Sequence, residues 1–128
     1  MLATAAPALG QAPGCNFETV AYQQAQQLQA NRQAEFRTAR TNLVNHLTSV
    51  YDAERAYRNA FIALIGSTGQ ARITNAQIVA DRQTTLTNLN GQTQGHFTET
   101  LNRQNVWDNY SRNAARALIV LRRCQGRL

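Results

Sequence analysis

The chain has 128 residues and a formal net charge of +6, although only 16% of its residues are charged. All thirteen basic residues are arginines, so lysine is absent. This length suits a single domain with a real core. No stretch approaches the ~20 apolar residues that a transmembrane helix needs.

The first fourteen residues, 1–14, are small, apolar and uncharged, unlike the rest of the chain. We interpret them as the end of a secretory signal peptide, with a cleavage site in Leu9–Ala12 or Ala8–Gly10. The positively charged start of a signal peptide is missing, so a disordered N-terminal arm is the alternative. Residues 15–128 are expected to form a single helical domain.

Two long stretches with helix-forming composition follow. Asn16–Ile65 contains neither proline nor glycine, and Asn75–Cys124 is a second stretch of equal length. The glycine-rich segment Gly66–Gly69 separates them and predicts a turn. The pattern therefore predicts an all-α fold, a long antiparallel hairpin of two helices of about 50 residues each.

Signals for helix ends agree with this reading. Asn16 suits the N-cap of the first helix, which is expected to stop at Gly66. Thr74 with Gln77 three residues later forms a capping box and predicts the start of the second helix. Gly126 follows the second stretch, where a helix end favours glycine.

The two cysteines, Cys15 and Cys124, lie at nearly equal distances from the turn. Folding the chain so that paired positions add to about 139 or 140 brings them together. We therefore predict one intramolecular disulfide that closes the hairpin, which also favours export because disulfides persist in oxidising compartments. A lipobox-like reading of Ala12–Cys15, with a lipid on Cys15, is the alternative.

A seven-residue repeat predicts the seam between the helices, with large residues followed three positions later mostly by alanine. In the first stretch the seam comprises Tyr22, Ala25, Gln29, Arg32, Phe36, Ala39, Leu43, His46, Val50, Ala53, Tyr57, Ala60 and Leu64. In the second it comprises Val79, Leu86, Leu89, Trp107, Tyr110, Ala114, Ala117 and Leu121. The pairing rule places Arg32 near Trp107 and His46 near His96.

Gly91 and Gly95 argue against a straight second helix, because each costs about 1 kcal/mol relative to alanine. The helix is expected to kink there or to break into two. A full reversal would give a compact three- or four-helix bundle, which is the alternative fold.

Several apolar residues fall outside the seam and predict a surface for self-association or for another protein. They are Val44, Tyr51, Ile62, Ile65, Leu118, Ile119 and Val120. We therefore expect a homo-oligomer or a contact with an envelope or secretion-complex protein.

Residues for catalysis or cofactor binding are scarce. His46, His96 and Glu99 form the best metal candidate, but a carboxylate-bridged site in a bundle needs Glu-x-x-His pairs that the chain lacks. The histidines are better read as seam residues bonded to Thr93 or Asn45. No nucleophile and base are placed as a pair, so we expect no enzyme, cofactor or metal site.

Arginines concentrate near the C-terminal end and predict a basic patch of Arg112, Arg116, Arg122 and Arg123. Such a patch can bind phosphates of nucleic acid or of lipid headgroups. Interleaved exposed aromatic residues, typical of nucleic-acid binders, are missing, so nucleic acid is the less favoured partner.

The sequence therefore indicates a non-enzymatic helical-hairpin protein, exported to the periplasm or the extracellular space. We expect it to act as a structural or assembly subunit, or as an interaction module, of a bacterial envelope or secretion complex. The alternative is a small basic nucleic-acid-binding protein in the cytoplasm, with both cysteines reduced.

Overall fold

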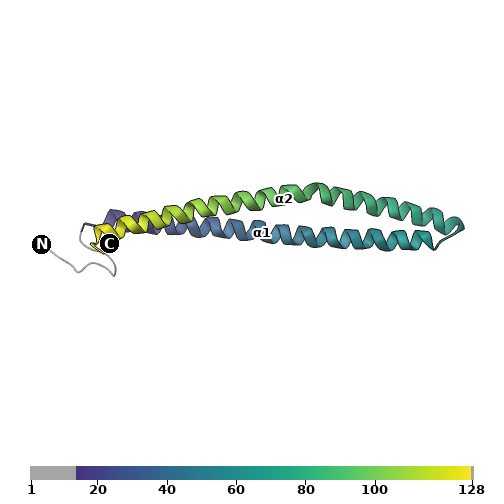
Figure 1. The fold of residues 1–128 in the computed structure, drawn as a ribbon, viewed down its shortest axis with the longest axis horizontal. Coiled ribbons are helices and arrows are strands. Elements are labelled where there is room, and N and C mark those ends of the chain that lie inside the picture. The colour runs from purple at the N-terminus through teal and green to yellow at the C-terminus, as the bar shows by residue number, and fades with distance from the viewer. Residues whose placement is uncertain (1–13, 128) are drawn as a thin grey trace. The chain divides into compact units, whose positions relative to one another are not determined.

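The computed structural model describes residues 14–127, which form two helices. Helix α1 spans Asn16–Ile65 and helix α2 spans Gly69–Cys124 (Figure 1). No β-strand occurs within this described range. The predicted all-α class is confirmed, whereas the expected signal peptide or arm lies, apart from Gly14, outside the described residues.

The chain divides into two compact units, and each contains one part of α1 and one part of α2. The disulfide unit combines the chain up to Arg37 with the chain from Asn102 onward, and the turn unit is Thr38–Leu101. Inside each unit the two helices run antiparallel and pack against each other. The predicted antiparallel hairpin is therefore confirmed.

Interhelix contacts show the same pairing of residues in both units. In the turn unit the Asn75 side chain donates to the Ala63 carbonyl, and Thr100 donates to the Ala39 carbonyl. In the disulfide unit Cys15 is bonded to Cys124. The residue numbers of these pairs add to 138 or 139, close to the register that the sequence predicts.

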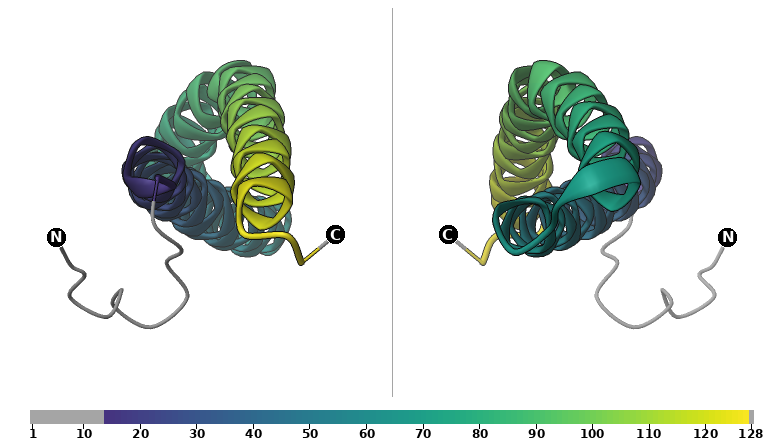
Figure 2. Two further views of the ribbon diagram at one scale, coloured as in Figure 1. Left: turned by 90° about the vertical axis from the view of Figure 1, so that its left-hand side faces the viewer. Right: turned by 90° about the vertical axis from the view of Figure 1, so that its right-hand side faces the viewer.

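The turn that joins the helices faces the viewer in the right-hand view of Figure 2. Two local features shape it. The Ser67 hydroxyl donates to the Leu64 carbonyl at 2.8 Å, which satisfies one carbonyl left unpaired at the end of α1. Gly69 then adopts a φ of +61°, a left-handed conformation that favours glycine.

The second helix begins earlier than the sequence predicts. Helix α2 starts at Gly69, and the Arg72 amide already donates to the Thr68 carbonyl at 3.4 Å. The expected start at Thr74 is wrong. The residues between the turn and Thr74 include good helix formers, so the helix can begin before its capping box.

The C-terminal end of α2 closes with a Schellman motif. The Arg127 amide donates to the Arg122 carbonyl at 2.8 Å, and the Gly126 amide donates to the Arg123 carbonyl at 3.1 Å. Gly126 has the φ of +71° that this motif requires. The predicted role of Gly126 is confirmed.

The predicted seam is the least exposed stripe of both helices. Every seam residue named from the sequence is half-buried or buried. Within residues 14–127, the buried residues are Cys15, Thr19, Ala39, His46 and Leu121. The contact between two helices is thus narrow, and most of each helix surface faces outward.

A kink or a break into two helices was expected at Gly91 and Gly95, and the break does not occur because helix α2 continues through both glycines. The compact three- or four-helix bundle is excluded with it. Seam residues flank the glycines on both sides, with Leu89 before them and His96 after them half-buried. Packing of these residues against α1 outweighs the intrinsic cost of glycine in a helix.

We predict that Gly91→Ala and Gly95→Ala each raise the free energy of unfolding by about 0.5–1 kcal/mol. A Cβ atom built at either position meets no atom within 4 Å, so the substitution removes chain entropy without a clash. Thermal unfolding followed by circular dichroism measures the change.

Gly126→Ala is the matched control, because the positive φ of Gly126 penalises any side chain. This variant is expected to lose stability. A fall in stability for Gly91→Ala or Gly95→Ala contradicts the prediction and means that the glycines serve a packing need.

Candidate functional site

The Cys15–Cys124 disulfide closes the disulfide unit. Its sulfur atoms lie 2.01 Å apart and its Cα atoms 5.9 Å apart. Neither cysteine is free, so the predicted pairing is confirmed and the lipid-anchor alternative for Cys15 does not agree with the structure. Cys15 is 1% exposed, and its carbonyl accepts hydrogen bonds from the Thr19 amide and hydroxyl, both at 2.9 Å.

An ion-pair cluster joins α1 to α2 inside the disulfide unit. Glu35 accepts from Arg32 at 2.7 Å and from Arg103 at 2.9 Å. The Arg32 guanidinium lies 5.0 Å from the centre of the Tyr110 ring. Side-chain hydrogen bonding with Tyr110, and then with Glu35, raises the pKa of Arg32 above its ordinary value. The cluster is a structural contact between the helices.

The aromatic neighbour of Arg32 differs from the sequence prediction. Arg32 was expected beside Trp107, but Trp107 stacks on Phe36 with ring centres 5.4 Å apart. Arg32 contacts Tyr110 instead, about one turn further along α2. A long arginine side chain reaches several seam positions, and the carboxylate of Glu35 selects among them.

A polar patch lies in the seam of the turn unit. His46 is 6% exposed, and its Nε2 atom lies 2.8 Å from the Thr93 hydroxyl oxygen. Because this hydroxyl donates to the Leu89 carbonyl at 3.4 Å, we assign the ring proton to His46 Nε2. The His46 and His96 rings stack with centres 4.4 Å apart. The predicted proximity of the histidines and the His46–Thr93 bond are confirmed.

This patch does not assemble a metal site. No group of three or more His, Cys, Asp or Glu side chains converges anywhere in the described range. Glu99 lines a surface hollow with His96, Asn42 and Gln92. The patch is best explained as a satisfied polar part of the seam.

The residues predicted for self-association are mostly exposed. In the turn unit Val44 is 54% exposed, and the other three reach 62–66%, namely Tyr51, Ile62 and Ile65. In the disulfide unit Ile119 and Val120 are exposed, while Leu118 is half-buried. Whether these side chains bind a partner stays a prediction.

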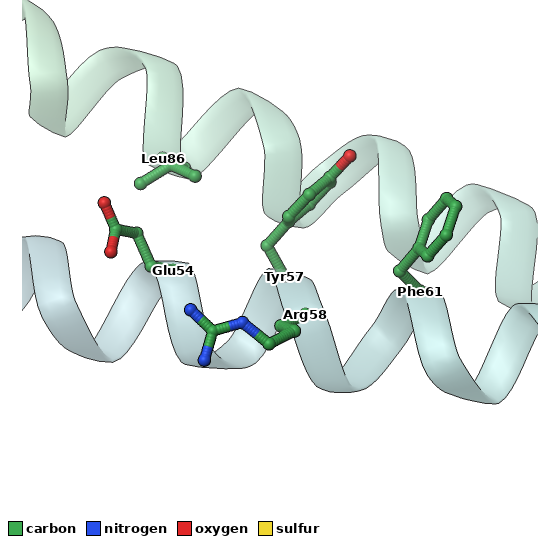
Figure 3. Close-up of a pocket in the computed structure, with 5 residues that line it drawn as sticks. All are labelled: Glu54, Tyr57, Arg58, Phe61 and Leu86. Atoms are coloured by element: carbon green, nitrogen blue, oxygen red, sulfur yellow. The ribbon is translucent and has the colours of Figure 1, made fainter.

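A groove in the turn unit was missed by the sequence reading. It has a volume of about 290 Å³ and is lined by Glu54, Tyr57, Arg58, Phe61 and Leu86. Figure 3 shows the Tyr57 and Phe61 rings leaning from α1 toward α2, with Glu54 near Leu86. The overlooked signal is a second row of residues on α1, alternately three and four positions apart, that lies directly beside the seam.

The predicted basic patch belongs to the disulfide unit. All four of its arginines are exposed: Arg112, Arg116, Arg122 and Arg123. Arg112 lies 3.7 Å from Asp108 in an exposed pair, which reduces its availability to an anion. Binding of nucleic acid by this patch stays a prediction.

The chain matches no protein-family model, no curated protein and no solved structure. Neither of the two described helices is long and apolar enough to cross a membrane. The surfaces of the two helices are therefore the basis for a proposed function of this protein.

The His46–Thr93 contact gives a test of the polar seam. Thr93→Val is expected to cost about 1–3 kcal/mol, because it leaves the buried His46 ring without its partner. The double change His46→Leu with Thr93→Val should cost less than Thr93→Val alone, since it removes both polar groups. Urea unfolding of each variant measures these differences.

Thr84→Val is the control, because Thr84 is exposed and bonds only within its own helix. Its effect should stay within about 0.5 kcal/mol. Equal costs for Thr93→Val and Thr84→Val contradict the assigned role of the seam hydrogen bond.

Proposed function

We propose that this protein is a non-enzymatic structural or assembly subunit of a bacterial envelope or secretion complex. The observation that carries the proposal is the set of large apolar side chains that α1 and α2 leave exposed outside their seam. The protein acts by burying these side chains against further helices, either of its own kind or of another subunit.

Three of the most exposed of these side chains lie near the turn end of α1. Tyr51, Ile62 and Ile65 are each more than 60% exposed, and all three lie within the last four turns of α1. Soluble proteins rarely leave neighbouring large apolar side chains uncovered unless the surface binds something. A helix that is apolar on more than one face is normally buried on more than one face.

The disulfide supports the proposed compartment. Disulfides are rare where glutathione and thioredoxin keep thiols reduced, and they persist in the periplasm and outside the cell. The Cys15–Cys124 bridge closes a loop with a sequence separation of 109 residues. A pair of helices with so narrow a seam gains from this constraint, because the bridge restricts the unfolded chain.

Self-association is the first test of this function. Multi-angle light scattering at tens of micromolar should give at least a dimer. Ile62→Glu in the turn unit and Ile119→Glu in the disulfide unit should each weaken association, because each places a charge on an exposed apolar residue. Helicity measured by circular dichroism should stay unchanged.

Asn59→Glu and Asn113→Glu are matched controls, since both replace an exposed polar residue with the same charge. They should leave the mass unchanged. A monomeric wild-type protein contradicts self-association and leaves a different subunit as the only partner for these side chains.

A further inference from the structure

A second stripe of residues runs along α1 beside the seam of the turn unit. We name it the outer stripe, and it consists of Leu47, Tyr51, Glu54, Arg58, Phe61 and Ile65. Each of its members directly follows a seam residue, so the stripe alternates spacings of four and three and lies on one side of the helix. All six are exposed.

The spacing of the outer stripe is that of a helix-packing surface. Residues that alternate three and four apart form the contact line of helices that pack side by side. Leu47 is 39%, Tyr51 62% and Ile65 66% exposed, so α2 covers these side chains only in part. The stripe has the pattern of a seam but no helix covers it within the described chain.

The groove beside the outer stripe is a recess into which side chains of a partner helix can fit. Phe61, Glu54 and Arg58 of the outer stripe form part of its lining, and Leu86 of α2 closes the other side (Figure 3). Its volume of about 290 Å³ accommodates side chains that project from a neighbouring helix.

The outer stripe is complementary to the same stripe of a second copy that runs in the opposite direction. Leu47 and Ile65 are its outermost members, Tyr51 and Phe61 come next, and Glu54 and Arg58 are central. The two residue numbers add to 112 in each of these pairs. Two antiparallel copies therefore match apolar with apolar, aromatic with aromatic, and acid with base.

The central charges favour this arrangement over others. Within residues 14–127, neither Glu54 nor Arg58 forms an ion pair. An antiparallel pair of copies sets Glu54 opposite the second copy's Arg58 twice, whereas a parallel pair sets like charges opposite each other. Like charges across an interface are a strong penalty.

We propose that the outer stripe binds a second copy of this chain, in an antiparallel contact between the two α1 helices around a two-fold axis. Such a contact is isologous, because the same surface is used on both chains. This inference rests on the proposed assembly function and names its first partner. A foreign partner has no need of the reversed symmetry, so a second copy explains the pattern best.

The expected affinity follows from the length of the stripe. From Leu47 to Ile65 the helix advances about 27 Å at ~1.5 Å per residue. A contact of this length along one helix is at the small end of specific interfaces, where association is weak or transient. We therefore expect a dissociation constant in the micromolar range. Association should accordingly be measured at tens of micromolar protein.

Charge reversal tests the register directly. Glu54→Arg gives a copy with two central arginines, and Arg58→Glu gives a copy with two central glutamates. Each variant alone should self-associate about tenfold or more weakly than the wild type, because like charges then meet twice. A mixture of the two variants should form mixed pairs, since each arginine then meets a glutamate. Native mass spectrometry separates mixed from like pairs, provided that one variant is isotope-labelled.

The double variant Glu54→Arg with Arg58→Glu should recover wild-type association, because both central pairs are restored with reversed sign. Asp81→Arg and Arg82→Glu are the controls, since they make the same charge changes at exposed positions of α2. They should leave association unchanged. Circular dichroism confirms that each variant keeps its helices.

Three results overturn the proposal. If the wild type associates and the charge reversals change nothing, the outer stripe is not the interface, although the proposed assembly function stands. If each variant associates more weakly and the mixture does not recover association, the copies do not meet in the antiparallel register. If the wild type is a monomer at tens of micromolar, both this contact and self-association fail.

Discussion

The narrow seam between α1 and α2 determines how the two helices are held together and which side chains remain exposed. Two helices can cover only one stripe of each other, so five residues of the described chain are buried. With so little burial, the free energy of folding depends on holding the helices in one register. A turn at Gly66–Thr68 sets that register in one unit, and the Cys15–Cys124 bridge sets it in the other.

Polar contacts in the seam reinforce the register more than they add to stability. The His46–Thr93 hydrogen bond and the Glu35–Arg103 ion pair each form only when the helices are correctly aligned. A shift by one turn leaves a buried imidazole without its partner, which is costly. An apolar seam of leucine and alanine alone tolerates such shifts better, so the polar residues favour one alignment over its neighbours.

The same narrow seam explains why the protein is expected to act through its surfaces. Side chains such as Tyr51 and Ile65 cannot reach the seam from their positions on α1, and they remain exposed. Their burial requires another helix. The reversed symmetry of the outer stripe makes a second copy of the chain the simplest source of that helix. The proposed role as an assembly subunit follows from this surface rather than from a reactive site.

Much of the fold could be predicted from the sequence, because helix breakers and cysteine positions are local signals. The end of α1 at Ile65 and the pairing of Cys15 with Cys124 followed from glycine and cysteine spacing alone. The start of α2 was misplaced, since a capping box marks where a helix can begin and does not prevent an earlier start. Arg32 was assigned to the wrong aromatic ring, because its long side chain reaches several positions. The outer stripe was only partly recognised, because Glu54 and Arg58 interrupt its apolar pattern.

The register between the helices is tested most directly by mass spectrometry of a non-reduced digest. The protein should be purified from its native compartment without reductant, with free thiols blocked at lysis. The account predicts one cross-linked species that joins the Cys15 peptide to the Cys124 peptide, in protein whose denatured, non-reduced mass is that of a single chain, and its conversion to two separate peptides on reduction. Two blocked thiols contradict both the bridge and the proposed export, and a lipid on Cys15 contradicts the bridge.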